Sequence, residues 1–251
     1  MTDAKDNTSE DREQPLIEHL IELRSRLLRC LLAVLVVFLG LTPFSNSLYS
    51  AIASPLMDRL PANASMIATE VASPFLVPFK LTVFLALFVT MPYLLYQLWA
   101  FVAPALYKNE KRLAFPLLMS SVILFYTGIA FAFFAVFPLL FKFFTSIAPA
   151  GVTVMTDISH YLDFILKMFF AFGMAFEIPI ATILMVSSGI ISVQALAQKR
   201  PYIIVGAFVV GMLLTPPDVL SQVLLAMPIW ILFELGLFFS RRFAPDEDSE
   251  A

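Results

Sequence analysis

The chain has 251 residues, of which 60% are apolar and only 14% are charged, and its mean hydropathy is +0.87. Soluble domains carry about 25% charged residues, so this composition excludes an ordinary soluble protein and indicates a membrane protein. The formal net charge is only −3 and the sequence has no long basic run, which argues against a nucleic-acid partner. The single cysteine, Cys30, excludes an intrachain disulfide framework.

The N-terminal part of the chain changes character near residue 14. Residues 1–13 are polar and acidic and lack an apolar period, so we expect a disordered tail there. In residues 15–29, leucines recur at helical spacing, while the other faces of the helix carry charges. We predict an amphipathic helix near the lipid headgroups that continues into the first spanning helix.

Six apolar stretches follow, and we predict that each is a spanning helix of an all-α integral membrane protein. They cover 27–43, 75–99, 115–143, 161–186, 201–214 and 219–239. Most lysines and arginines lie before the first stretch or after the second, fourth and sixth, whereas the loops near 44–74, 144–160 and 215–218 hold only Arg59. Because basic loops stay in the cytoplasm during insertion, both termini are predicted to be cytoplasmic. We therefore expect one six-span domain over 14–243 and an acidic cytoplasmic tail over 244–251.

Prolines and helix length predict an irregular bundle. Prolines interrupt most spans and should kink them, which gives a curved bundle; they are Pro78, Pro92, Pro116, Pro138, Pro179 and Pro228. The loop 44–74 mixes apolar and polar residues around Pro55 and should form short helices over the outer face. The fifth stretch would be only about 21 Å long, against about 30 Å of hydrocarbon. Such a helix either thins the bilayer or is shielded by its neighbours.

Glu177 lies in the middle of the fourth stretch, where an ionisable group is costly unless it faces the bundle interior or water. We considered Lys80 or Lys167 as its partner, although Lys167 is about 15 Å away along the same helix and cannot pair with it directly. A proton relay and a structural hydrogen bond both remain open, and we favour the structural role. Glu234, near the end of the sixth stretch, could extend toward Arg241.

Residues 215–218 read Thr-Pro-Pro-Asp and have a local explanation. Thr215 can cap the sixth helix, proline suits its first turn, and Asp218 can return the capping bond. Gln222 follows on the same face as Asp218, so it extends a polar stripe that can hydrogen-bond a partner helix.

Enzyme motifs are missing from the sequence. It has no phosphate loop, G-x-S-x-G or H-E-x-x-H, and the predicted topology separates His19 from His160 by the membrane, so we expect no enzyme, metal site or cofactor. Two acids, Glu22 and Glu110, face the cytoplasm in this topology and can each take a guanidinium through paired hydrogen bonds. The ordinary alternative is that Glu22 pairs with Arg26 at i+4 and that Glu110 is solvated.

Four segments resemble one known family. They are QPLIEHLIELR at 14–24, MIATE at 66–70, WAFVAPALY at 99–107 and GMLLTPPD at 211–218. On these segments the chain resembles the TatC subunit of the twin-arginine protein translocase, over about residues 14–242.

The resemblance implies a signal-peptide receptor in the bacterial cytoplasmic (inner) membrane. Such a subunit binds signal peptides with two adjacent arginines and helps to export folded proteins with the proton motive force, together with single-span TatA- and TatB-type subunits and further copies of itself. Carried over by position, the peptide-binding residues are Glu22, Glu110, Leu16, Leu23, Arg24, Phe101, Leu106 and Arg112. The partner-helix residues are Met212, Leu213, Thr215 and Gln222, and Pro55 and Asp218 belong to the outer face. The alternative is an ion-coupled secondary transporter that uses Glu177 with Lys80 or Lys167.

Overall fold

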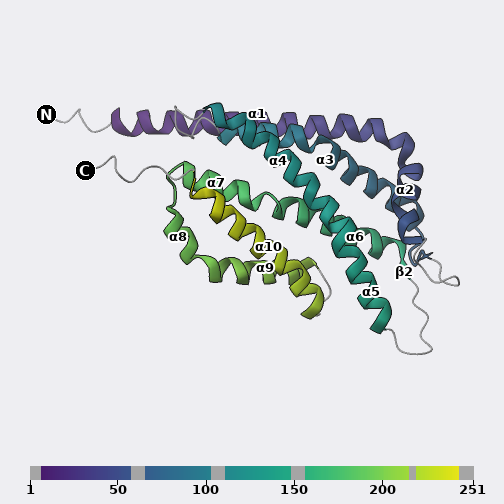
Figure 1. Ribbon diagram of the computed structural model, residues 1–251. Coiled ribbons are helices and arrows are strands. Elements are labelled where there is room, and N and C mark those ends of the chain that lie inside the picture. Colours follow the sequence, from purple (N-terminus) through teal and green to yellow (C-terminus); the bar gives the residue numbers. More distant parts are fainter. Residues whose placement is uncertain (1–6, 58–65, 103–110, 148–155, 215–218, 243–251) are drawn as a thin grey trace.

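The computed structural model describes residues 7–57, 66–102, 111–147, 156–214 and 219–242. They form a helical bundle, as predicted (Figure 1). Its α-helices are α1 (Asn7–Leu41), α2 (Ser45–Met57), α3 (Ser73–Val102), α4 (Lys111–Phe131), α5 (Phe137–Ile147), α6 (Ile158–Ala175), α7 (Ile178–Ser187), α8 (Val193–Gln198), α9 (Arg200–Leu214) and α10 (Val219–Ser240). A 3₁₀ turn, η1 (Thr42–Phe44), joins α1 to α2, and a π-helical segment, η3 (Ala132–Val136), joins α4 to α5. The strands β1 (Met66–Ile67) and β2 (Thr156–Asp157) form a short parallel pair.

The helices account for the six predicted stretches. Within the described part of the chain, five helical segments are long and apolar enough to cross a membrane. They comprise α1 with α2, α3, α4 with η3 and α5, α6 with α7, and α10. The remaining stretch is α9, which has only 15 residues and is therefore short for a bilayer, as expected. α1 begins at Asn7, so regular structure reaches into the segment 1–13, for which the sequence predicted none.

The two ends of the bundle differ in composition. The start of α1, the end of α3, the start of α4, α8 and the end of α10 lie at the same end (left in Figure 1). We call it the basic end, because it carries Arg24, Arg26, Arg29, Lys111, Arg112, Lys199, Arg200, Arg241 and Arg242. The opposite end carries α2 and the strand pair (Figure 1), and we call it the strand end. This arrangement matches the predicted distribution of the cations.

The core lies between α3, α4, α6 and α10, and α1 packs on its edge through α3. Glycines bring two of these helices close together. A Cβ on Gly128 of α4 would meet the Phe172 carbonyl oxygen at 2.4 Å, and one on Gly173 would meet the Phe125 ring at 2.6 Å. Because both positions lack a side chain, the backbone of α4 meets the backbone of α6 at Gly128, and the Phe125 ring packs on the backbone of α6 at Gly173, as small residues allow in membranes.

Proline kinks are accommodated by neighbouring helices, as the sequence predicted. Pro92 has no N–H, so the carbonyl of Phe88 four residues earlier in α3 loses its helical donor. The hydroxyl of Tyr126 on α4 donates to this carbonyl at 2.8 Å. The fourth span breaks between α6 and α7, where Pro179 occupies the first turn of α7. The bundle is therefore kinked and held together by contacts between helices.

Candidate functional site

Arg26 anchors α1 to the end of α3 at the basic end. Its Nε and Nη2 donate to Oε1 of Glu22 at 2.9 and 2.6 Å, one helical turn away. Its Nη1 donates to Oε1 of Gln97 at 3.1 Å, and Nη2 also donates to the Ala100 carbonyl at 3.2 Å. The amide of Gln97 in turn donates to the Tyr93 hydroxyl at 2.7 Å. The i+4 pair expected from the sequence is therefore confirmed, but the link to α3 was not anticipated, because sequence spacing says nothing of contacts between helices.

An aromatic contact reinforces this junction. The rings of His19 on α1 and Phe101 on α3 are stacked, with centroids 4.2 Å apart and planes inclined by 18°. Phe101 is one of the predicted receptor residues, and it lies one residue before the end of α3. The stack and the Arg26 contacts together fix the orientation of α1 where it leaves the bundle.

Glu22 keeps part of its carboxylate accessible in this arrangement. The side chain is 38% exposed, and Oε2 faces His19 Nδ1 at 3.9 Å, which is beyond hydrogen-bond distance. Both bonds from Arg26 go to Oε1, so among the described residues Oε2 has no hydrogen-bond donor. The neighbouring Leu23 and Arg24 are exposed on the same helix. The described part of the basic end thus presents a carboxylate beside an apolar and a basic side chain.

The other predicted receptor residues cannot be placed by their side chains. Glu110 and Leu106 fall in 103–110, outside the described residues. Leu16 and Arg112 belong to α1 and α4 by backbone only. Residues 103–110 connect the end of α3 to the start of α4, both at the basic end (Figure 1).

The predicted partner-helix residues lie on α9 and α10. Met212 and Leu213 are exposed, at 54% and 72%. Gln222 donates from Nε2 to the Phe208 carbonyl at 2.9 Å, and a Cβ on Gly211 would touch its Cγ at 3.2 Å. Gln222 therefore joins α9 to α10 within this chain. Thr215 and Asp218 lie outside the described residues, so their predicted caps are not tested, and Pro55 belongs to α2 by backbone only.

Glu177 makes the structural hydrogen bond that the sequence favoured, but the lysine considered as its partner, Lys80, does not pair with it. Glu177 accepts a hydrogen bond from the Ser121 hydroxyl of α4, and Lys80 pairs instead with Asp163 of α6. Glu177 Oε1 is buried without a hydrogen-bond partner among the described residues. The close approach at Gly128 and Gly173 brings Ser121 to Glu177, and no spacing rule on one helix predicts such a contact.

Glu234 also has a different partner from the one expected. It forms a two-point ion pair with Arg200 of α9, from Nε at 2.6 Å and from Nη2 at 3.0 Å. Arg241, the partner considered from the sequence, lies two helical turns further along the chain. The structure therefore uses Glu234 to join α9 and α10.

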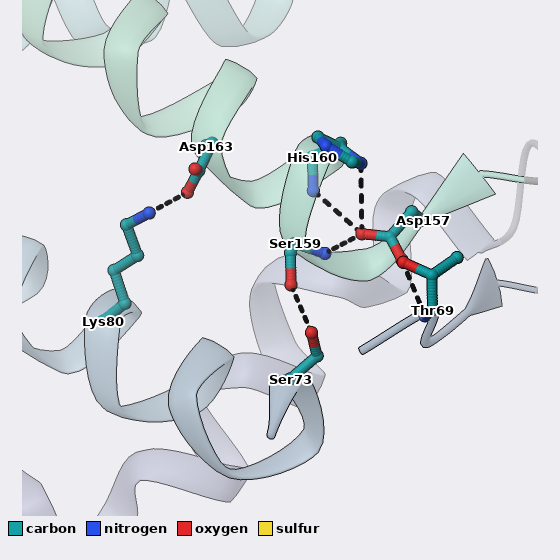
Figure 2. A network of polar contacts seen from close by, with 7 residues as sticks. All are labelled: Thr69, Ser73, Lys80, Asp157, Ser159, His160 and Asp163. Atoms are coloured by element: carbon teal, nitrogen blue, oxygen red, sulfur yellow. Dashed lines mark hydrogen bonds and ion pairs between the residues drawn. The ribbon is translucent and has the colours of Figure 1, made fainter. Parts of the chain in front are cut away.

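Asp157 organises the strand end (Figure 2). Its Oδ1 accepts bonds from the backbone N–H groups of Ser159 and His160 and caps α6. Its Oδ2 accepts bonds from the hydroxyl and the N–H of Thr69 at 2.7 and 2.9 Å. These bonds, led by the Thr69 hydroxyl, hold the pKa of Asp157 well below its ordinary range. The hydroxyls of Ser73 and Ser159 bond beside it at 2.8 Å, so the loop before α3 is tied to the start of α6.

Comparison with known proteins shows relatives that are similar to this chain in sequence and in fold. The family described as Sec-independent protein translocase protein (TatC) matches residues 18–228. A Sec-independent protein translocase protein TatC from Haemophilus influenzae is 59% identical over 241 residues, covering 96% of this chain and 94% of its own length. Its counterpart from Escherichia coli K12 is 58% identical over 228 residues, covering 91% and 88%. A crystal structure of the twin-arginine translocase receptor TatC superposes with a TM-score of 0.81 at 35% identity, over 90% of this chain and 99% of that one. The chain therefore belongs to the TatC family of protein translocase subunits.

Proposed function

We propose that this protein is the signal-peptide receptor and core subunit of a twin-arginine translocase in the bacterial cytoplasmic membrane, where it exports folded proteins with the proton motive force. The observation that carries the proposal is the part-exposed carboxylate of Glu22 at the hydrogen-bonded junction between α1 and α3, where no described residue donates to Oε2. An anchored carboxylate of this kind can take a guanidinium at Oε2 while Oε1 keeps its bonds from Arg26. Membership of the TatC family favours this role over the ion-coupled transporter, as does the pairing of Lys80 with Asp163.

In this proposal Glu110 supplies the second carboxylate. It directly precedes Lys111, the first residue of α4 at the basic end. Two adjacent arginines of a signal peptide would each meet one acid, while Leu16, Leu23, Arg24, Phe101, Leu106 and Arg112 shape the surrounding surface. A guanidinium donates through two parallel N–H groups and an ammonium cannot reproduce that geometry, so paired lysines should be poor substitutes.

Photocross-linking in nanodiscs tests the proposal. A photoreactive residue replaces the exposed Leu23, so that the carboxylates of Glu22 and Glu110 are kept, and the peptide carries either paired arginines or paired lysines. The matched control position is 71, because Val71 is also an exposed apolar residue and lies at the strand end. We expect cross-links from position 23 to the arginine peptide, few to the lysine peptide, and none from position 71. Equal cross-linking to both peptides would contradict an arginine receptor.

We also propose that single-span TatA- or TatB-type subunits dock on the exposed face of α9 around Met212 and Leu213, with Thr215 and Gln222 at its end. The support is the exposure of both apolar side chains beside a polar helix junction. Photocross-linking from position 213 to such a partner tests the idea, with position 170 of α6 as the control, since Phe170 is also partly exposed, at 41%. Cross-links of equal yield from both positions would argue against a specific site on α9.

A further inference from the structure

A cavity at the basic end of α9 and α10 is not used by the proposed receptor surface. It has a volume of about 400 Å³ and is lined by Arg200, Trp230, Ile231, Glu234, Phe238 and Arg241, among others. The lining runs along one side of α10 from Trp230 to Arg241, which is about 16 Å of helix. Arg241 lies at the basic end and Arg200 contacts Glu234, while Trp230 and Ile231 lie about one turn deeper along α10 than Glu234. The cavity therefore has a charged mouth and an apolar body.

The ion pair between Arg200 and Glu234 sets the depth of the mouth. Arg200 is the first residue of α9, whereas Glu234 is six residues before the end of α10. The two side chains are in direct contact, so the start of α9 packs beside α10 about 9 Å of helix before the end of α10. The ion pair therefore holds the two helices together at the mouth of the cavity.

The arginines keep donors available for a ligand at this mouth. A guanidinium has five N–H donors, and Glu234 accepts one bond from Nε and one from Nη2 of Arg200. The carboxylate therefore orients Arg200, and within the described part of the chain its Nη1 has no hydrogen-bond acceptor. Arg241 is exposed just beyond the end of α10. With two arginines and one glutamate, the mouth has a net positive charge.

The apolar body faces the bilayer. Trp230, Ile231 and Phe238 are 41%, 46% and 60% exposed on a spanning helix, so hydrocarbon is the medium that they meet. A ligand that matches both parts needs a negative headgroup and an acyl chain. Basic pockets between spanning helices on the cytoplasmic side have this chemistry.

We propose that this cavity binds an anionic glycerophospholipid, whose phosphate accepts hydrogen bonds from Arg200 and Arg241 and whose acyl chain lies along Trp230, Ile231 and Phe238. Glu234 acts as a positioning residue that holds Arg200 toward the headgroup. The site is separate from the peptide surface on α1 and α3, so the test of lipid binding does not depend on the proposed function.

Tryptophan quenching tests this site directly. The chain has two tryptophans, and the other one, Trp99, is only 6% exposed. In a Trp99→Phe background, the full chain is placed in phosphatidylcholine nanodiscs that contain either brominated phosphatidylglycerol or an equal fraction of brominated phosphatidylcholine. We expect stronger quenching of Trp230 by the anionic lipid. Arg241→Gln should reduce that preference roughly five-fold, whereas Arg242→Gln, the adjacent cation outside the lining, should leave it unchanged.

Four outcomes would overturn the proposal. Equal quenching by both lipids would show that the cavity does not select for charge. An equal loss of preference in the Arg241 and Arg242 variants would assign the effect to general surface charge. Removal of the preference by excess inorganic phosphate would identify a phosphate site that needs no lipid. If neither lipid quenches Trp230 once the partner subunits are added, a protein helix covers the cavity instead.

Discussion

Two carboxylates, one at each end of the bundle, show how the same group serves different purposes. Asp157 at the strand end is 8% exposed, and its two oxygens receive four hydrogen bonds from Thr69, Ser159 and His160. Glu22 at the basic end is 38% exposed, and Arg26 contacts only one of its oxygens. A carboxylate whose two oxygens both accept hydrogen bonds fixes a loop to a helix. A carboxylate with only one oxygen bonded keeps an acceptor for a peptide ligand. This difference predicts that substitutions at the two ends separate stability from peptide binding.

The largest effect on peptide binding is expected for Glu22→Gln. The amide is isosteric but uncharged, and a hydrogen bond to a charged group contributes about 1.5–3 kcal/mol, so affinity for a twin-arginine peptide should fall roughly ten- to hundred-fold. Fluorescence anisotropy of the peptide, with the protein in nanodiscs, measures this affinity. Glu70→Gln at the strand end is the matched control and should bind normally. Unchanged affinity in Glu22→Gln would remove this carboxylate from the receptor.

For Asp157→Asn we expect a loss of stability without a loss of peptide binding. The new amide can still cap α6 through its oxygen, but its NH₂ would face the N–H and hydroxyl of Thr69, which are both donors here. The thermal unfolding temperature should drop by several degrees, while peptide affinity stays unchanged. Thr69→Ser keeps the hydroxyl and should lower the unfolding temperature much less. A loss of peptide binding without a loss of stability would break the distinction between the two ends.

Arg26→Lys tests the anchor beneath Glu22. Lysine keeps the charge but cannot reach Glu22, Gln97 and the Ala100 carbonyl together, because it lacks the planar guanidinium. Losing the two contacts to α3 should destabilise the junction by about 1–3 kcal/mol. Hydrogen exchange of the α1 amides near residue 26 should become faster, with little change elsewhere. Equal protection in both proteins would mean that α1 is held by its apolar contacts alone.

The smallest effect on stability is expected from a change of pH. The Thr69 hydroxyl and N–H groups lower the pKa of Asp157 in the folded protein, so its stabilising contribution is fully present above the ordinary aspartate pKa of about 3.9. It is lost only as the pH falls from there toward the lower folded pKa. The gap in unfolding temperature between the parent and Asp157→Asn should therefore not narrow as the pH falls from about 8 to 5. A gap that closes within this range would mean that Asp157 titrates near neutrality.

The sequence by itself determined the elements and the chemistry available at each end. Apolar stretches set the spans, the positions of the cations set the basic end, and Pro92 already required a donor from another helix, which Tyr126 supplies. The ion pair of Glu22 with Arg26 at i+4 could also be predicted from the sequence, because residues one turn apart share a helix face. The motifs at 14–24, 99–107 and 211–218 indicated the family.

Only the tertiary structure decided which groups meet across helices. Glu177 bonds to Ser121 and not to a lysine, Lys80 pairs with Asp163, and Glu234 pairs with Arg200. Asp157 and Thr69 meet across 88 positions of sequence. Helical periodicity specifies the face on which a residue lies, but tilt, kinks and the close approach at small residues such as Gly128 set the neighbour that this face meets. These partners follow from packing in three dimensions, which spacing along one chain does not encode.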